Sequence, residues 1–360
     1  MAKRQITKKE IMKTLEQFSQ QIPTIPIATV WLLNDLSEHL GKQELFTKQS
    51  PQKLKKLREH ALIESAVSSN RIEGVEIDRK RVGTVIFGKS LLQDRNEEEV
   101  RGYKSALAWI HGNGSKIKMS SATIKKLHAL TRPNIWDRGK IKEDDGEIIE
   151  KHADGRVTIR FKPTSAAETP EALKNLCDLS VRHLRNKEIP PLIIWAAQNL
   201  DFLCIHPFRD GNGRVSRLLL LLSLYHLGFE AGHYISLERI IEQSKERYYE
   251  TLKQSSQRWH EGRHDPWPYV NYLLYALKEL YTEFERRVGE VRVSRGEKTE
   301  IVHQTVSGFR APFHITELQK LCPGVSLDMI RKVLKDMRVA GDVKCMGRGK
   351  NALWRVLGNG

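Results

Sequence analysis

Apolar residues recur at intervals of three and four over most of residues 1–290, which is the spacing of one buried helix face. Glycine and proline are sparse inside these segments. The pattern predicts helices at residues 97–110, 121–131, 170–185, 192–204, 215–227 and 268–288. Pro191 suits the first turn of one of them, and Gly228 suits the end of another. We therefore predict a mainly α protein.

Residues 146–161 follow a different pattern. Ile148 and Ile149 precede the turn-prone sequence Ala-Asp-Gly at 153–155, and a β-branched run begins at Val157. Two short apolar runs around such a turn are typical of a β-hairpin. We predict a hairpin here, within an otherwise helical domain.

The charged stretch at residues 292–300 predicts a linker, and the chain beyond it has a different pattern. We divide the chain into an N-terminal helical region at 1–95, a core domain at 96–290 and a C-terminal domain at 300–360. This division gives three parts, which is reasonable for a chain of 360 residues.

In the C-terminal domain, residues 313–315 predict a strand, and Thr316 is expected to cap a helix that runs to Cys322. Ser326 is expected to cap a second helix, and Gly341 to end it. Strands at 343–346 and 352–356 follow, joined by a turn at 347–351. Helices followed by a two-stranded hairpin predict a winged helix-turn-helix.

Composition changes this picture only in part. The formal net charge of +16 fits either contact with nucleic acid or a basic, solubilising surface. Four widely spaced cysteines without CxxC spacing argue against zinc knuckles and disulfides, and fit a reducing cytoplasm. The longest apolar run, at 218–229, falls short of the roughly 20 residues of a membrane span. We expect a cytoplasmic protein with no signal peptide and no membrane contact.

Residues 206–217 hold a concentration of chemical groups. His206 lies at a helix end, and an imidazole is the side chain best suited to act as a base near neutral pH. Asp210 offers a carboxylate suited to Mg²⁺. Residues 211–213 open the next helix with two glycines, whose backbone can approach an anion closely. Arg214 and Arg217 share one helical face and can hold phosphate oxygens. The set indicates phosphoryl or nucleotidyl transfer.

A structural explanation exists for each piece alone, since a single histidine often caps a helix and a GxG is often a tight loop. The whole run makes that explanation weak. His-Pro-Phe-Arg-Asp-Gly-Asn-Gly-Arg-Val-Ser-Arg at 206–217 resembles the HxFx(D/E)GNGRxxR signature of Fic-domain proteins at every position. Glu99–Tyr103, Leu127-His128 and Ala196-Ala197 also resemble Fic helices, whereas Gln198 stands where many relatives carry histidine.

The resemblance implies a role for each residue of the motif. His206 would deprotonate a target hydroxyl, and Asp210 would hold Mg²⁺. The amides of Gly211 and Gly213, with Asn212, would bind the α-phosphate region of ATP, and Arg214 and Arg217 the β- and γ-phosphates. Phe208 would pack in the core. Tyr248 and Tyr249 resemble the region that closes over the purine, although they fit core positions equally well.

Two further segments gain a meaning from the resemblance. Ser69, Glu73 and Gly74 fit the (S/T)xxxE(G/N) inhibitory motif of the family, in the class with an N-terminal inhibitory helix. The hairpin, with Val157, Thr158, Ile159 and Arg160, would be the flap that pairs with an extended segment of the target. Homodimerisation is expected by resemblance only.

The sequence therefore predicts a protein adenylyltransferase that transfers AMP from ATP to a Ser, Thr or Tyr hydroxyl of a target protein and of itself, autoinhibited by Glu73. UMP, phosphocholine or phosphate transfer remains a nearby alternative, although the intact Arg217 favours a triphosphate donor. A different class is a nucleotide-sensing Fic core that serves a DNA-binding winged helix. Its phosphate contacts would be Lys320, Arg331, Lys332, Lys335, Arg338, Lys344, Arg348 and Lys350. Winged helices also dock proteins, so residues 300–360 are expected to contact DNA or protein.

Overall fold

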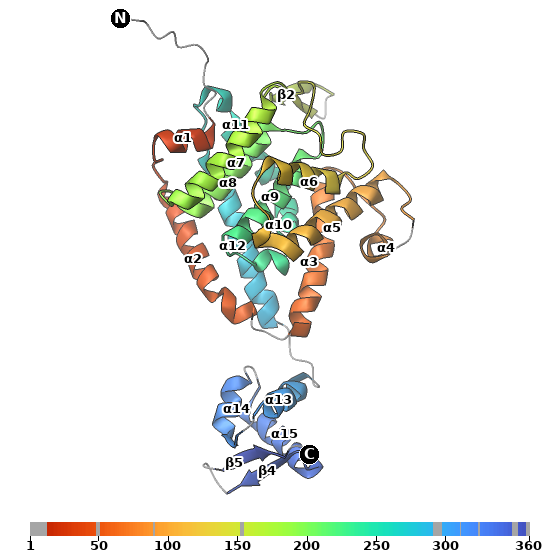
Figure 1. The fold of residues 1–360 in the computed structure, drawn as a ribbon, viewed down its shortest axis with the longest axis vertical. Helices are drawn as coiled ribbons and strands as arrows, with labels where there is room; N and C mark the ends of the chain where they lie inside the picture. The colour runs from red at the N-terminus through yellow and green to blue at the C-terminus, as the bar shows by residue number, and fades with distance from the viewer. Residues whose placement is uncertain are drawn as a thin grey trace, which may run out of the picture. The chain divides into compact units, whose positions relative to one another are not determined.

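The computed structural model describes residues 13–47, 51–88, 91–151, 155–290, 297–309, 311–322, 325–347 and 352–357. The chain divides into two compact units, Met1–Val288 and Gly289–Gly360. Both units are mainly helical and carry small sheets (Figure 1). No helix among the described residues is long and apolar enough to cross a bilayer.

The first unit is a helical assembly with one two-stranded sheet. Its elements are α1 (Thr14–Gln20), α2 (Ile27–Thr47), α3 (Pro51–Ile72), α4 (Val82–Phe87), α5 (Arg95–Asn113), α6 (Ser121–Thr131), β1 (Ile148–Lys151), β2 (Val157–Phe161), α7 (Thr169–Asn186), α8 (Pro191–Ile205), α9 (Asn212–His226), α10 (Leu237–Gln243), α11 (Lys245–Ser256) and α12 (Trp267–Glu290). Short 3₁₀ turns lie at Gly114–Lys116, Ala231–His233 and Trp259–Glu261.

Helices α8 and α9 form the centre of this unit, and nearly every residue of both is buried. In Figure 1 they lie between α2 on one side and α3 on the other. Pro191 occupies the first turn of α8, where a missing N–H costs nothing. The segment 206–217 connects α8 to the start of α9, so its position is fixed by the most buried part of the fold.

The second unit has its own small core. Helices α13 (Glu297–Ser307), α14 (Ile315–Leu321) and α15 (Leu327–Ala340) pack with a sheet of strand order β3-β5-β4, formed by β3 (Phe313–His314), β4 (Val343–Met346) and β5 (Leu353–Val356). Ser326 caps α15 by accepting a hydrogen bond from the Met329 amide at 3.3 Å. Gly341 ends the same helix at φ +86°, a conformation that glycine adopts without strain.

Most predicted elements are confirmed within one to three residues, including the hairpin, in which β1 and β2 pair antiparallel. Thr316 as a helix cap was wrong. The cap is His314, because Glu317 accepts the His314 backbone N–H at 2.9 Å, and the helix therefore starts at Ile315, two residues earlier than predicted. The linker at 292–300 was too long, since α13 begins at Glu297. Its residues 292–296, Ala153 and Asp154 of the hairpin turn, and the turn residues 348–351 lie outside the described residues.

Candidate active site

His206 is the C-terminal cap of α8 and adopts a left-handed conformation with φ +51°, which is uncommon for a residue other than glycine. Lys142 holds the chain on both sides of it. The Lys142 backbone N–H donates to the Pro207 carbonyl at 2.9 Å, and its Nζ donates to the Ile205 carbonyl at 3.2 Å. These two bonds stabilise the backbone conformation that turns the imidazole out of the helix.

The imidazole of His206 is set up as a neutral base. Its Nδ1 lies 3.2 Å from the Leu203 carbonyl and therefore carries the proton, which leaves Nε2 unprotonated. Burial lowers the pKa of His206 to about 4, and the nearby Lys142 charge acts in the same direction. The carboxylates of Glu73 and Asp210 oppose this shift. At neutral pH the side chain is uncharged and able to accept a proton.

The loop after His206 is closed by two side chains. Asn212 donates to the Phe208 carbonyl at 2.7 Å and accepts from the Phe208 amide at 2.9 Å, so its side chain fixes the loop. His128 stacks on Phe208 with ring centroids 4.0 Å apart. Its Nδ1 accepts from the Gly139 amide at 3.0 Å, and its Nε2 donates to the Asp210 carbonyl at 3.1 Å. This neutral tautomer uses both ring nitrogens.

Arg217 on α9 is held by the C-terminal end of α3. Its Nε donates to Ser69 Oγ at 2.8 Å, and its Nη2 donates to the Ser69 carbonyl and to Glu73 Oε1, both at 2.8 Å. The Arg217 side chain is 1% exposed and that of Glu73 is 29% exposed. Burial acts to lower the pKa of Arg217, but the Glu73 carboxylate and the nearby Tyr248, Tyr103 and Tyr249 together outweigh burial and raise that pKa. Arg217 Nη1 is buried and has no hydrogen-bond partner among the described residues.

Gly213 makes room for this contact. A Cβ at position 213 would lie 2.2 Å from Glu73 Oε1 and 3.3 Å from Arg217 Nη1. The first turn of α9 also leaves backbone N–H groups without partners inside the helix. The Glu73 carboxylate therefore lies against the end of a helix that is suited to bind an anion.

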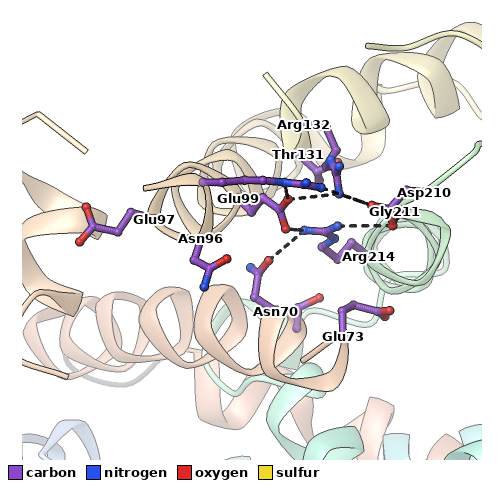
Figure 2. Close-up of polar contacts among 12 residues, drawn as sticks. Asn70, Glu73, Asn96, Glu97, Glu99, Thr131, Arg132, Asp210, Gly211 and Arg214 are labelled. Carbon is purple, nitrogen blue, oxygen red and sulfur yellow. Dashed lines mark hydrogen bonds and ion pairs between the residues drawn. The ribbon is translucent and has the colours of Figure 1, made fainter. Parts of the chain in front are cut away.

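Arg214 and Asp210 belong to a second cluster, beside the first (Figure 2). Arg214 donates to Glu99 on α5 and, at 3.2 Å, to Asn70 on α3. Arg132 Nη1 lies 2.6 Å from Asp210 Oδ2. Burial acts to raise the pKa of Asp210, but Arg132 and Arg214 outweigh it and keep the pKa below its ordinary value. The Asp210 side chain remains 57% exposed, so it is accessible to a ligand.

A cavity of about 390 Å³ opens beside His206. It is bounded by the motif, the end of α3, the hairpin and α11, and its lining residues are Glu73, Ile148, Ile149, Arg160, Phe161, Leu203, Cys204, His206, Gly213, Arg217, Tyr248, Tyr249, Leu252 and Ser256. The structure thus brings the predicted base, two predicted phosphate ligands, Gly213 and Arg217, and the predicted inhibitory carboxylate to one cavity. Asp210 and Arg214 are absent from the described lining residues.

The two tyrosines occupy different positions. Tyr248 is 1% exposed and packs in the core, 5.7 Å from the ring centroid of Tyr272, so the core interpretation applies to it although it also reaches the cavity. Tyr249 is only partly buried, and its hydroxyl donates to the Ile72 carbonyl at 3.4 Å. Arg160 of β2 donates to the Tyr249 carbonyl at 2.6 Å and ties the hairpin to α11.

The outer residues of the hairpin remain accessible. Val157 is 56% exposed and Ile159 is 58% exposed, and Thr158 is exposed between them. At the other side of the cavity, Gly74 follows Glu73 with φ +78°, so the end of α3 turns away immediately after the carboxylate. Strand β2 is therefore accessible to another chain, and the end of α3 lies at the cavity wall.

Residues 118–224 match the Fic/DOC family. This segment, which includes the motif at 206–217, is therefore similar to a Fic domain. The chain is 27% identical over 147 residues to a protein adenylyltransferase, fic-1, of Caenorhabditis elegans, and 27% identical over 213 residues to the protein adenylyltransferase Fic of Nematostella vectensis. These matches cover 41% and 56% of the chain, but only 27% and 45% of the length of the two relatives.

Solved structures share the fold. A Fic family protein of Desulfovibrio desulfuricans has a TM-score of 0.62 and 22% identity over 94% of this chain and 98% of its own. A Fic domain containing signaling protein of Bacteroides thetaiotaomicron has a TM-score of 0.60 and 21% identity over 71% of this chain and 97% of its own. At these identities the likeness supports the Fic fold.

Three residues of the site gave no signal of their role in the sequence. Arg132 and Lys142 look like ordinary surface cations in a loop-rich stretch, and the role of Glu99 depends on which residues meet it in the fold. His128 lies in a Leu-His pair that resembles the family, but its two hydrogen bonds depend on the tertiary structure.

Proposed function

We propose that this chain is a protein adenylyltransferase that transfers AMP from ATP to a Ser, Thr or Tyr hydroxyl of a target protein and of itself. One observation carries the proposal. A neutral His206 with a free Nε2 lines the same cavity as the buried Arg217, whose Nη1 lacks a partner among the described residues. A buried guanidinium N–H without a hydrogen-bond partner, on a residue that lines a cavity, suits an anionic ligand. The relatives, which are protein adenylyltransferases, suggest the chemistry.

In the proposed reaction, His206 Nε2 accepts the proton of the target hydroxyl while the oxygen attacks the α-phosphorus of ATP. The bond between the α-phosphorus and the bridging oxygen breaks, and pyrophosphate leaves. Arg214 and Arg217 bind the β- and γ-phosphates and stabilise the charge that develops on the leaving group. Gly211, Asn212 and Gly213 form the helix start that receives the α-phosphate.

Asp210 is the residue that would hold Mg²⁺. No group of three or more histidine, cysteine, aspartate or glutamate side chains within the described ranges is placed to bind a metal by itself. A single accessible carboxylate nevertheless fits this ion, which usually binds to one or two carboxylates together with substrate phosphates. When bound, Mg²⁺ would neutralise phosphate charge.

The segment at the end of α3 is proposed to keep the enzyme inactive. Glu73 takes up a donor of Arg217 and lies where an added Cβ on Gly213 would be, so its charge opposes a triphosphate at the same place. Ser69 Oγ accepts a hydrogen bond from Arg217 Nε and so orients the guanidinium. Gly74, at φ +78°, lets the chain turn away after Glu73. ATP bound beside Glu73 would have its α-phosphate turned away from in-line attack, and small misplacements cost about 100-fold in rate.

The remaining parts follow the same proposal. Residues 1–95 carry the inhibitory motif, 96–290 the Fic core, and 300–360 a winged-helix domain. The hairpin Val157, Thr158, Ile159 and Arg160 docks the target, and Tyr248 and Tyr249 bound the purine site. We further propose that the protein is cytoplasmic, because all four cysteines are free of disulfides, and that it forms a homodimer.

A second function, contact with DNA, is favoured by one observation on the C-terminal unit. Arg331, Lys332, Lys335 and Arg338 are exposed along α15, opposite the buried face of that helix. Asp328 and Asp336 reduce this positive charge. We expect the full chain to bind duplex DNA with an affinity that falls steeply as salt rises. Binding that is unchanged by Lys335→Glu with Arg338→Glu would favour protein docking instead.

The adenylyltransferase proposal is tested with His206→Ala. Loss of the base is expected to lower the rate of AMP transfer by about 10²–10⁴-fold while ATP binding persists. The measurement pairs incorporation of α-labelled ATP with ATP affinity, both in a chain freed of Glu73. Transfer at the parent rate by His206→Ala would refute the assigned mechanism.

A further inference from the structure

Glu99 on α5 lies where three guanidinium groups converge, and none of the roles proposed above uses it. Its Oε1 accepts from Arg95 Nε at 2.8 Å and lies 3.2 Å from Arg132 Nη1. Its Oε2 accepts from Arg214. The Glu99 side chain is 6% exposed and those of Arg132 and Arg214 are 4% and 2% exposed. This carboxylate is therefore enclosed beneath the site, out of reach of a substrate.

The same contacts connect Glu99 to the proposed metal ligand. Arg132 Nη1 contacts Glu99 on one side and Asp210 Oδ2, at 2.6 Å, on the other (Figure 2). The second carboxylate oxygen of Asp210 accepts from the Gly211 amide at 2.6 Å. Both oxygens are thus oriented from the protein side, and more than half of the Asp210 side chain stays exposed. A carboxylate held in this way is oriented for a cation without being covered.

Local sequence explains why Arg132 arrives at this position. Helix α6 ends at Thr131, and Gly102 of α5 lies directly against that end. A Cβ on Gly102 would lie 2.7 Å from the Thr131 carbonyl oxygen and 2.8 Å from that of Leu130. The close approach that glycine permits delivers Arg132 to the face of α5 that carries Glu99, one turn earlier.

We propose that Glu99 is a positioning residue that sets two functional groups together: the phosphate-binding guanidinium of Arg214 directly, and the metal-binding carboxylate of Asp210 through Arg132. The inference rests on the proposed function of these two residues. Supporting groups of this kind typically change metal affinity by about 10–100-fold when they are removed. A cluster that served folding alone would leave ligand binding unchanged in any variant that folds.

Glu97 provides a matched control. It lies on the same helix two residues away and is 3% exposed, compared with 5% for Glu99. It is also paired with an arginine, since Arg81 Nη2 donates to it at 2.9 Å. Figure 2 shows it pointing away from the cluster around Arg214. Glu97→Gln and Glu99→Gln therefore remove the same charge from equally buried positions, and only the second touches the site.

The experiment measures the affinity of α,β-methylene-ATP and of AMP by calorimetry, with Mg²⁺ and with EDTA, in a Glu73→Gly parent. The probe cannot release AMP, so no turnover occurs. We expect Glu99→Gln to weaken binding of α,β-methylene-ATP at least about 10-fold in the presence of Mg²⁺. The same substitution should weaken binding of AMP less than about 2-fold. Arg132→Gln is expected to weaken binding of the probe when Mg²⁺ is present. In EDTA its affinity for the probe should equal that of the parent, because Arg132 acts through the proposed metal ligand Asp210. Glu97→Gln is expected to match the parent throughout.

Each variant is first checked for a cooperative thermal transition, and Arg132→Gln carries the test if Glu99→Gln does not fold. Equal affinities in the parent and in Glu99→Gln, or equal losses in Glu97→Gln and Glu99→Gln, would overturn the inference alone. A loss in Arg132→Gln of the same size with and without Mg²⁺ would overturn its metal half. A parent that does not bind the probe would overturn the proposed function as well.

Discussion

Helix α9 presents two arginines to the site, and two glutamates hold them in different ways. Arg214 pairs with Glu99, which is 6% exposed, lies within α5 and contacts two further arginines. Arg217 pairs with Glu73, which is 29% exposed and is followed at once by the turn at Gly74. The Glu99 carboxylate is enclosed by three arginines and compensates their positive charge. The Glu73 carboxylate lies at a helix end, on the wall of a cavity.

The difference indicates which ion pair belongs to the framework and which can be displaced. Removing one partner of a buried pair leaves an uncompensated charge and costs about 3–5 kcal/mol, whereas a partly exposed pair contributes less. Arg217 also keeps two bonds to Ser69 when Glu73 leaves, so its guanidinium stays in place. An inhibitory contact needs this combination, because the arginine must remain oriented after the carboxylate has gone.

The largest expected effect is therefore on stability at Glu99. Glu99→Gln should lower the free energy of unfolding by about 3–5 kcal/mol, because it removes the carboxylate charge that compensates the buried guanidinium of Arg214. Glu73→Gln should lower it by less than about 1 kcal/mol. Urea unfolding of both variants measures the difference. Equal losses would mean that the two pairs do not differ as described.

Gly102→Ala should have the next largest effect. The new methyl group would meet the carbonyl oxygen of Thr131, a backbone atom that cannot rotate away, and forced packing of this kind costs about 1–3 kcal/mol. Gly112, on the same helix with open space around it, gives the control in Gly112→Ala. Thermal unfolding compares the two, and a control that loses as much as Gly102→Ala would remove the argument for close approach.

The motif at 206–217 and Glu73 could be predicted from the sequence far better than the cluster around Glu99. The run from His206 to Arg217 is contiguous, so its candidate residues and its place at the junction of two helices could be predicted together. The same holds for Glu73, whose motif is local. Glu99 on α5 pairs with Arg214 on α9 and with Arg132, the residue that follows the end of α6. No periodicity along the chain encodes which residues meet across helices, so this cluster needed the tertiary structure.

Other gaps have equally specific causes. The left-handed backbone of His206 was not predicted, because that conformation is rare without glycine and depends on the two bonds from Lys142. Helix starts were misplaced by a residue or more where capping came from an unexpected side chain, as at His314. Helix interiors, governed by apolar spacing, were predicted well.

Ser69→Ala should have a smaller effect. It removes the acceptor of Arg217 Nε and should cost about 1 kcal/mol of stability, while the bond to the Ser69 carbonyl remains. Ser68, which is 3% exposed and precedes it, provides a neighbouring buried control in Ser68→Ala. Denaturant titration of both variants checks the value. A loss above about 3 kcal/mol would show that Ser69 does more than orient Arg217.

The smallest expected effect is that of pH on AMP transfer by the Glu73→Gly chain. With a pKa of about 4, His206 stays neutral, so AMP transfer by Glu73→Gly should change less than about 2-fold between pH 8 and pH 6. Removing Glu73 also removes an anion that raises the pKa of His206, which strengthens this expectation. An unshifted histidine would lose about fourfold at pH 6. Initial rates across the range distinguish the two cases.

The most direct test of the account compares labelling by α-labelled ATP in three chains: the wild type, Glu73→Gly, and Glu73→Gly with His206→Ala. The account predicts faint labelling of the wild type, about 100-fold more in Glu73→Gly, and a return to faint labelling when His206 is also removed. ATP binding is measured in all three. Equal labelling of the wild type and Glu73→Gly, with ATP bound in both, would contradict inhibition by Glu73, and labelling that survives His206→Ala would contradict the proposed base.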